Sequence, residues 1–380
     1  MVNNIDTDLC LQYEIGHMSK KKQQADNMAP QARRSVTIKD LARELDLSIT
    51  TISRALNGYS DVGEKTRQRV IETAQKQGYR PNRNAQRLVT QRTHNIAWVQ
   101  ADSDRKFVDP HFIEVMAGVL RGARAGNYDI VLSSDTPEQQ LATYDRYVKD
   151  NSVDGFIIDL PQPNDPRISF LLEAQKPFVV HGREALNDQY GWVDIDNFGI
   201  YYDLTRLMVA NGHKKIAFVN GDENFVFAVN RRCGVHAALD DLGLPRDTVR
   251  IFNTVHPMGD AGYQLTEQVL EDSSVTAILY SSALMAVEGH SAIFQAGRRA
   301  GDNLEVGTID DQLHFLDLTP FAGQFTFVRS SLRDAGVAII EELIRQCEKK
   351  GAPSGTLMPH TFDYASKLDA SVLSTPSRSS

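Results

Sequence analysis

The stretch LSITTISRALNG, residues 47–58, has the pattern of a short amphipathic helix with a clear start and stop. Ser48 is placed to cap the helix, Ile52 and Leu56 fall on one face of it, and an Asn-Gly pair ends it. Its other side chains are short hydroxyl and apolar groups with one arginine, a set that allows close approach to a DNA groove. On its own, the stretch fits an ordinary amphipathic helix equally well.

A second short helix is predicted just before this one. Thr37 is placed to cap it, and Asp40 stands three residues later, at the reciprocal position of a capping box. A third helix is expected from about Glu64 to Lys76. Two short helices joined by so tight a turn predict a helix-turn-helix, although a simple helical hairpin gives the same pattern.

Charge is distributed unevenly along the chain, whose net charge is −8. Residues 31–93 hold 13 Lys and Arg against 6 Asp and Glu, whereas residues 94–380 hold 25 against 39. A small basic module joined to a large acidic body indicates that only the front of the chain meets a polyanion. Chance clustering of charge is the alternative explanation.

The composition is typical of a globular protein with two or three domains: 380 residues, 41% apolar and 24% charged. No apolar run approaches the roughly 20 residues that cross a membrane, and the N-terminus lacks a signal-peptide pattern. The three cysteines lie far apart without a Cys-x-x-Cys pair, so neither disulfides nor a zinc site are expected. We therefore expect a cytoplasmic protein without membrane contact, metal or cofactor.

Beyond residue 94, short apolar runs rich in β-branched residues alternate with amphipathic segments. This alternation is typical of a parallel, doubly wound α/β sheet, and ten strands exceed what one such sheet usually takes. We therefore predict two α/β lobes, with a ligand in the cleft between them, beyond the carboxyl ends of the strands. The predicted strands are 95–101, 128–134, 155–160, 177–182, 192–196, 215–221, 249–253, 275–282, 304–310 and 325–328; the segments between them include 111–126, 137–150, 198–213, 229–242, 261–271 and 332–349.

The same patterns divide the chain into five parts. The two ends are polar and lack periodicity, which is typical of disorder. The parts are a disordered extension (1–35), a helix-turn-helix DNA-binding headpiece (36–80), a linker with a short helical piece (81–93), a two-lobed body (94–366) and a disordered tail (367–380).

An enzyme is not expected. The chain has no P-loop, no G-x-G-x-x-G after the first predicted strand, no G-x-S-x-G and no H-E-x-x-H. The histidines of the body are scattered rather than grouped. A sugar-active enzyme on an α/β scaffold therefore lacks support from motifs.

Residues 36–88, VTIKDLARELDLSITTISRALNGYSDVGEKTRQRVIETAQKQGYRPNRNAQRL, resemble the headpiece of the LacI/GalR transcriptional regulators without gaps. The resemblance continues to about residue 365 through PFVVHGR, VDIDN, NGHKKIAFVNG and GTIDD. It implies a homodimer on an inverted-repeat operator in double-stranded DNA, with a dimerising, effector-binding body of the periplasmic-binding-protein type. It also implies a hinge helix at 82–88 that folds only on DNA, where Leu88 wedges into the minor groove.

One departure from the family lies in the helix-turn-helix turn, where Asp46 stands in place of the usual glycine. Asp tolerates a positive φ, so we expect the turn to survive. Arg54 is the side chain of the second helix that can bond guanine in bidentate fashion. The residues expected to contact DNA are Thr37, Ser48, Ile49, Thr50, Thr51, Ser53, Arg54, Asn57, Tyr79, Asn82, Ala85 and Leu88.

The resemblance also implies an effector site for a sugar, which needs polar side chains for its hydroxyls and aromatic rings for its apolar face. Asp159 ends a predicted strand, and Arg231 matches the effector-binding arginine of the family. Ser281-Ser282 replaces the Asn-Asp pair of the family, so Ser282 stands where an aspartate is usual. Asp310 ends another strand, and the nearby aromatic residues are Phe107, Phe112, Phe225 and Phe227.

The leading hypothesis is a repressor of sugar uptake or catabolism genes that is controlled by a sugar effector. Ser281-Ser282 together with ALMA resembles regulators of α-glucoside uptake in proteobacteria. The alternatives are the same regulator with a nucleobase or a phosphorylated metabolite as effector, and a sugar-binding protein without regulation. The C-terminus lacks leucine heptads, which favours a dimer over a tetramer.

Overall fold

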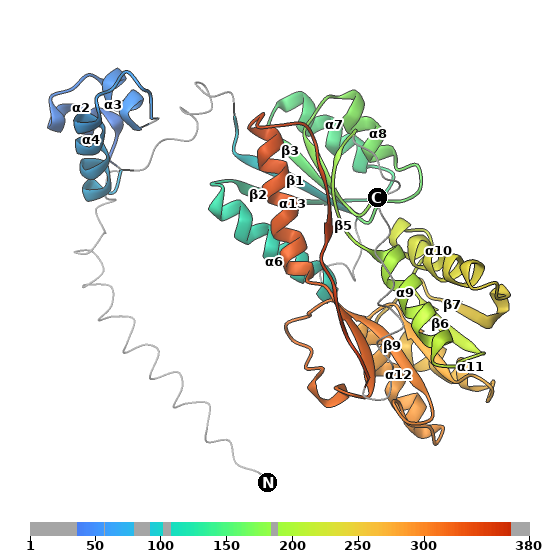
Figure 1. Ribbon diagram of the computed structural model, residues 1–380. Helices are drawn as coiled ribbons and strands as arrows, with labels where there is room; N and C mark the ends of the chain where they lie inside the picture. Colours follow the sequence, from blue (N-terminus) through green and yellow to red (C-terminus); the bar gives the residue numbers. More distant parts are fainter. Residues whose placement is uncertain (1–35, 57, 80–91, 102–107, 184–188, 366–380) are drawn as a thin grey trace, which may run out of the picture. The chain divides into compact units, whose positions relative to one another are not determined.

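The computed structural model describes residues 36–56, 58–79, 92–101, 108–183 and 189–365 (Figure 1). The chain divides into two units, the first ending at Gln91 and the second beginning at Arg92. The predicted terminal extension and tail, the hinge helix and the wedge lie outside the described residues. So do four predicted contact residues: Asn57, Asn82, Ala85 and Leu88.

The first unit is a three-helix headpiece built from α2 (Ile38–Leu45), α3 (Ile49–Leu56) and α4 (Glu64–Gln77). The predicted helix-turn-helix is confirmed. The helices share a small core because each turns an apolar stripe inward. Its buried residues are Leu41, Leu45, Ile52, Ala55, Val62, Val70 and Ala74.

Local capping bonds begin both helices of the motif where the sequence predicts. The Asp40 carboxylate accepts hydrogen bonds from the Thr37 backbone N–H (2.9 Å) and hydroxyl (2.7 Å). The Ser48 hydroxyl oxygen accepts one from the Thr51 N–H (3.0 Å). Between the helices, Asp46 has φ 51° and ψ 47°, the left-handed conformation that a glycine would otherwise supply. The turn therefore survives the replacement of glycine by aspartate.

The second unit holds two six-stranded sheets, one in each lobe, and all ten predicted strands are present. The first sheet has the order β11-β5-β4-β3-β1-β2 and the second β12-β10-β9-β8-β6-β7. Neighbouring strands are parallel except for the pair β10–β12. The strands are β1 (Asn95–Ala101), β2 (Asp129–Asp135), β3 (Gly155–Asp159), β4 (Phe178–His181), β5 (Gly191–Ile195), β6 (Ile216–Asn220), β7 (Val249–Asn253), β8 (Ala277–Tyr280), β9 (Glu305–Asp310), β10 (Phe325–Arg329), β11 (Gly355–Met358) and β12 (Thr361–Asp363).

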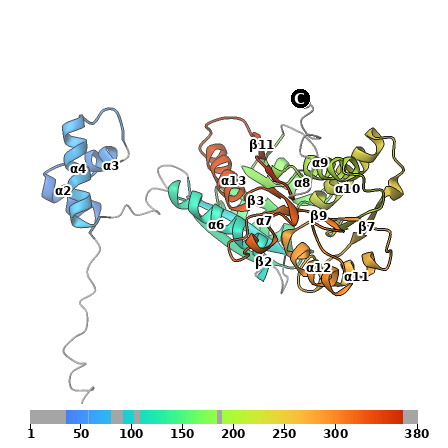
Figure 2. The same ribbon diagram turned by 60° about the horizontal axis from the view of Figure 1, so that its bottom comes forward.

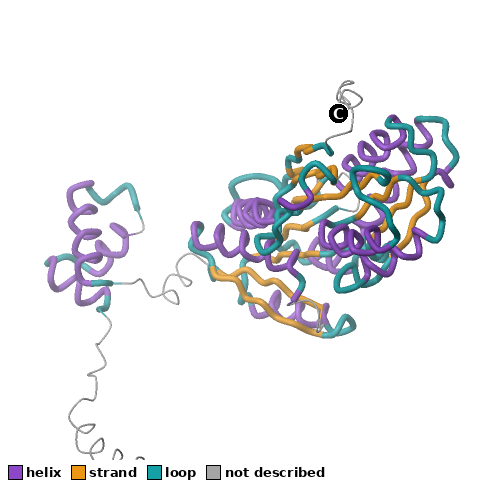
Figure 3. The backbone as a smooth tube through the Cα atoms, turned by 90° about the horizontal axis from the view of Figure 1, so that it is seen from below, coloured by secondary structure: helices purple, strands orange, loops and turns teal. Residues whose placement is uncertain are grey.

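Helices cover both faces of each sheet, as Figure 3 shows by colour. In β6, Ile216 and Phe218 belong to a core with residues of α9 and α10, whereas Ala217 and Val219 belong to one with residues of α11 and α12. This alternation makes the strands apolar on both sides. The helices are α6 (Pro110–Ala125), α7 (Gln140–Asp150), α8 (Pro166–Glu173) and α13 (Leu332–Cys347) in the first lobe, and α9 (Asn197–Ala210), α10 (Val226–Asp241), α11 (Ala261–Leu270) and α12 (Ala283–Gln295) in the second. No helix in the described ranges is long and apolar enough to cross a membrane.

Helix α13 comes from the end of the chain but packs along α6 of the first lobe (Figures 1 and 2). Two glycines allow this close crossing. A Cβ atom at Gly118 would collide with the carbonyl of Arg333, and one at Gly336 with the carbonyl of Val115. Because the obstacle is backbone in both cases, a side-chain rotation cannot relieve the overlap.

We expect Gly118→Ala to destabilise the body by about 1–3 kcal/mol, because the added methyl forces α6 and α13 apart. The measurement is the urea midpoint of unfolding, followed by circular dichroism. Gly221→Ala is the matched control, since its Cβ would lie 3.8 Å from the Phe227 ring, an ordinary contact. Equal midpoints for the two variants would contradict the tight crossing.

Candidate functional site

The headpiece exposes one side of α3 and buries the other. Ile49 is 45% exposed although it is a large aliphatic residue, whereas Ile52, one turn later, is fully buried. Exposure of an aliphatic side chain beside hydroxyl groups suits contact with thymine methyls and base edges. Of the other predicted contact residues on this helix, Thr50 and Arg54 are exposed, and Thr51 and Ser53 are partly buried; Ser48, just before the helix, is exposed.

Arg54, the predicted guanine ligand, bonds within the headpiece. Its Nε and Nη2 atoms donate to the two carboxylate oxygens of Asp61 at 3.1 and 2.8 Å. Its guanidinium also lies 5.0 Å from the ring centroid of Tyr59. Since both charged side chains are about half exposed, the pair contributes little stability and opens easily.

The remaining described contact candidates, Thr37 and Tyr79, lie beside the core. The Thr37 hydroxyl donates to Asp40 (2.7 Å), so it already has a partner. Tyr79 packs against the headpiece core just after α4, and burial raises the pKa of its hydroxyl. Both residues stay predicted DNA contacts.

A cavity of about 510 Å³ lies between the two lobes of the body. Residues at the carboxyl ends of the strands and in the segments that follow them form its wall, as expected for parallel sheets. From the first lobe come Gln100, Asp159, Asp165 and Arg167, and from the second Asp222, Phe225 and Phe227, among others.

The first-lobe wall is polar and buried. Gln100 ends in an amide that donates to Asp159 at 3.3 Å, and the two residues are 1% and 6% exposed. Arg167 pairs with Asp165 (2.6 Å), and it also donates to the backbone oxygens of Asp159 (3.1 Å) and Leu160 (3.2 Å). Hydrogen bonds with Asp165 outweigh the effect of burial and raise the pKa of Arg167. The arginine therefore neutralises one carboxylate and rigidifies the wall.

The second-lobe wall is aromatic. Phe225 and Phe227 stack with ring centroids 5.9 Å apart and an interplanar angle of 6°. The Arg231 guanidinium lies 5.0 Å from the Phe227 centroid, and its Nε donates to the Asn197 side-chain oxygen at 2.7 Å. Arg231 therefore contacts the aromatic wall without lining the cavity itself.

The structure brings some of the predicted effector residues together and separates others. Asp159 and Phe227 face the cavity, and Arg231 lies against Phe227. Ser282 and Asp310 do not line it: Ser282 caps α12 by accepting from Met285 N–H (3.3 Å), and Asp310 pairs with Arg329 (3.1 Å). Phe112 lies in the core, with its ring centroid 5.1 Å from that of Trp98. The prediction for Phe107 falls outside the described residues.

Gln100 is a lining residue that sequence reasoning missed. It lies near the end of β1, directly beside the strand that ends in Asp159. The strand-end argument that selected Asp159 applies to it equally. A neutral amide, however, carries no charge signal that would draw attention to it.

Comparison with known families agrees with both units. Residues 37–82 match the model of bacterial regulatory proteins of the lacI family. Residues 93–362 match the model of periplasmic binding proteins and the sugar binding domain of the LacI family. The chain belongs to the LacI family. It is therefore a helix-turn-helix regulator of transcription, and members of this family are DNA-binding regulators rather than enzymes.

Curated relatives in the LacI family include the transcriptional regulator AglR of Rhizobium meliloti, which is 39% identical over 311 residues, 81% of this chain and 87% of AglR. The regulator RafR of Escherichia coli is 32% identical over 70% of this chain and 79% of RafR. Among solved structures, the Lac repressor dimer bound to operator and the anti-inducer ONPF superposes with a TM-score of 0.66 at 23% identity, covering 87% of this chain and 98% of that one. The CelR–cellobiose complex superposes with a TM-score of 0.61 at 24% identity, covering 86% of this chain and 98% of that one.

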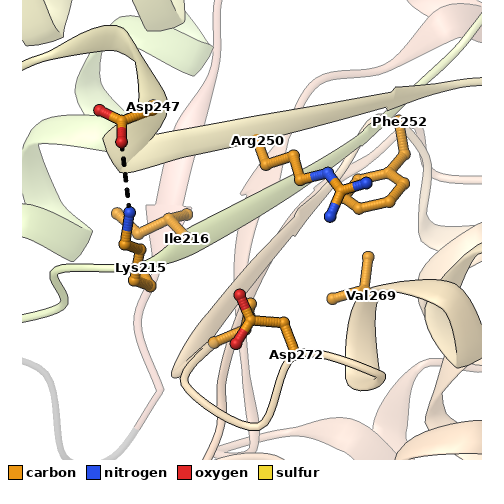
Figure 4. Close-up of a pocket in the computed structure, with 8 residues that line it drawn as sticks. Lys215, Ile216, Asp247, Arg250, Phe252, Val269 and Asp272 are labelled. Carbon is orange, nitrogen blue, oxygen red and sulfur yellow. Dashed lines mark hydrogen bonds and ion pairs between the residues drawn. The ribbon is translucent and has the colours of Figure 1, made fainter.

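A second hollow of about 250 Å³ lies at the amino ends of β6, β7 and β8 (Figure 4). Lys215 and Asp247 form an ion pair at its rim (3.4 Å), and the Arg250 guanidinium lies 4.7 Å from the Phe252 ring centroid. Ligands of parallel α/β sheets bind at the opposite, carboxyl ends of the strands. The cavity between the lobes is therefore the better candidate for the effector site of this LacI-family chain.

The first turn of α6 ties the two lobes together beside the cavity. His111 bonds Asp109 of its own lobe (Nδ1–Oδ1, 2.9 Å) and Asp311 of the other (Nε2–Oδ2, 3.4 Å). Burial alone lowers the pKa of His111, but hydrogen bonds to the two aspartates and their charge outweigh it and raise the pKa to about 9. One turn later, Glu114 accepts from the His314 backbone N–H of the second lobe (2.9 Å).

We expect this contact to weaken in alkali. Because the folded pKa of His111 (about 9) lies above its ordinary value of about 6.5, its stabilisation is complete below the lower value and is lost as the pH rises through about 9. The melting temperature of the wild type should therefore fall more between about pH 7 and about pH 10 than that of His111→Gln. Asp311→Asn removes a carboxylate that pairs with His111. The melting temperature of this variant should therefore also fall less over the same pH range than that of the wild type. Parallel profiles for all three proteins would contradict the interlobe ion pair.

Proposed function

We propose that the protein is a cytoplasmic repressor of genes for sugar uptake or catabolism, whose effector is a sugar bound between the lobes. The observation that carries this proposal is the pairing, within one LacI-family chain, of an exposed recognition helix with a cavity that is polar on one wall and aromatic on the other. A solved structural neighbour supports it, because that structure is a complex of the regulator CelR with cellobiose.

The chemistry of the cavity suits a neutral polyhydroxylated ligand. Gln100 offers an amide, and Asp159 carboxylate oxygens, for a pair of adjacent hydroxyls. Phe225 and Phe227 offer flat apolar surface for the C–H face of a sugar ring. Arg231, behind Phe227, stays our candidate for a residue that reaches the ligand once the lobes close.

A phosphorylated effector is disfavoured by charge. Among the described lining residues, four aspartates stand against one arginine and one histidine, and the arginine is bonded to Asp165. A phosphate brought into this wall would meet a predominantly negative field. A nucleobase stays the second candidate, because the stacked phenylalanines also suit a planar ring.

For DNA binding we propose a homodimer on an inverted repeat. Ile113 and Leu120 on α6, and Phe294 on α12, are large apolar residues that the chain leaves exposed. Ile113 and Leu120 lie two turns apart on the same helix, and contiguous apolar surface commonly marks contact with another chain. We infer that a second copy covers them, which would place two headpieces on two half-sites of an operator.

Fluorescence anisotropy with an inverted-repeat operator tests the proposed function. We expect salt-dependent binding that prefers the operator over random duplex, and a change in operator affinity when the correct sugar is added. The panel contains mono- and disaccharides, nucleobases and a sugar phosphate. Response to the sugar phosphate alone, or lack of response to every sugar, would overturn the sugar effector while leaving DNA binding intact.

We expect Arg54→Ala to reduce operator affinity by about 1–3 kcal/mol and random-duplex affinity by much less, because a bidentate guanine contact is specific. The measurement is the difference in affinity for the two duplexes at fixed salt. Arg43→Ala is the matched control, since Arg43 is an exposed arginine on α2 rather than on α3. An equal loss on both duplexes would make Arg54 a phosphate contact instead.

A further inference from the structure

The side chain of Gln140 ends in a buried amide nitrogen that has no hydrogen-bond partner. Gln140 begins α7, lines the cavity between the lobes and is 7% exposed. Of the described residues that line this cavity, only Gln140 has a buried side-chain nitrogen or oxygen without a partner. In folded proteins the large majority of buried side-chain polar atoms are bonded, so this exception needs an explanation.

Packing of α7 on the first sheet fixes the position of this side chain. Tyr144 lies one turn after Gln140 on the same face of the helix, because residues four apart share a face. Tyr144 is fully buried, and its ring centroid lies 5.3 Å from that of Phe156 in β3. Gln140 is therefore held against the sheet rather than turned to solvent. Since α7 follows β2, its first residue lies near the carboxyl ends of the strands.

The unpartnered Nε2 atom of Gln140 lowers the stability of the ligand-free protein. An amide that is taken out of water without a new hydrogen bond destabilises the folded state. An apolar side chain of similar shape would avoid this loss at the same position. Groups that lower stability in this way are expected at functional sites, where a ligand supplies the missing partner.

The other polar groups of the first-lobe wall leave a role for one more donor. The aspartates that line the cavity are acceptors when they are ionised. Gln100 donates to Asp159, and Arg167 is held by Asp165 and by two backbone oxygens. A sugar hydroxyl that donates to a carboxylate still has an oxygen that can accept a hydrogen bond. The amide of Gln140 can donate to such an oxygen.

Rotation of the side chain alone can turn this donor toward the cavity. Nε2 lies beneath the cavity surface in the ligand-free protein. The terminal torsion of glutamine is broad and roughly two-fold, so half a turn exchanges Nε2 with Oε1. Because Nε2 has no partner within the described part of the chain, this rotation breaks no bond that the donor makes.

We propose that Gln140 is a specificity-determining residue of the effector site, whose Nε2 atom donates to a hydroxyl oxygen of the bound sugar. This inference rests on the proposed sugar effector and adds a first-lobe contact to it. A ligand that places a C–H or N–H group at this point leaves the donor unpaired, because neither group accepts a hydrogen bond. Gln140 therefore favours a hydroxylated ring.

Gln140→Met tests this role, because methionine is also long and unbranched but carries no N–H donor. We expect the ligand-free variant to melt at the temperature of the wild type or up to about 3 °C higher, since an unpaired donor is removed. Calorimetric titration of the full chain with glucose, galactose, maltose, sucrose and trehalose identifies the sugar that the wild type binds most tightly. The affinity for that sugar should fall about fivefold or more in Gln140→Met.

Gln139→Met is the matched control, because Gln139 is the exposed neighbour of Gln140 and does not line the cavity. It should change neither the melting temperature nor the sugar affinity. A lower melting temperature of ligand-free Gln140→Met would mean that the amide is already bonded, and would overturn the proposal. Equal sugar affinity of Gln140→Met and the wild type would overturn it while the sugar effector stands. A wild type that binds none of the sugars would overturn the sugar effector itself, and the role of Gln140 with it.

Discussion

Parallel pairing of strands is the constraint on which the rest of this body depends. When neighbouring strands run in one direction, the loops that follow them all leave from the same edge of the sheet. Gln100 and Asp159 meet for this reason, although 59 residues separate them in sequence. Each lobe has such an edge, and the cavity lies between the two edges. The ligand chemistry is therefore assembled from strand ends rather than from one continuous motif.

Helix α6 contacts both the second lobe and α13. Its first turn touches the second lobe through His111 and Glu114, and its middle is locked against α13 through Gly118 and Gly336. Helix α13 begins directly after β10 of the second lobe and packs on the first. A change in the angle between the lobes would therefore disturb the contacts at the start of α6, where His111 and Glu114 meet the second lobe. Rigid lobes moving about a small contact are a common route for coupling two sites.

The headpiece helices could be predicted from their regular apolar faces, and ten strands from short apolar runs that are buried on both sides. The family resemblance decided between a helix-turn-helix and a simple helical hairpin. The apolar runs missed β11 and β12, whose residues are mostly exposed or partly exposed and too few to show a pattern. Asp159 could be placed by its position at a strand end. Ser282 came from the resemblance, and Asp310 from the resemblance together with its place at a strand end. Local bonds to α12 and to Arg329 already engage these two residues. Contacts such as His111 with Asp311 join residues 200 positions apart, and a single sequence carries no signal for them.

The ion pair of Arg54 with Asp61 bears on the guanine contact that we propose for this arginine. To bond a guanine, Arg54 would have to give up the two bonds that the Asp61 carboxylate accepts from it. Because a half-exposed pair of this kind is weak, the exchange would cost little. Asp61 therefore orients the guanidinium on the surface of the free headpiece without locking it there.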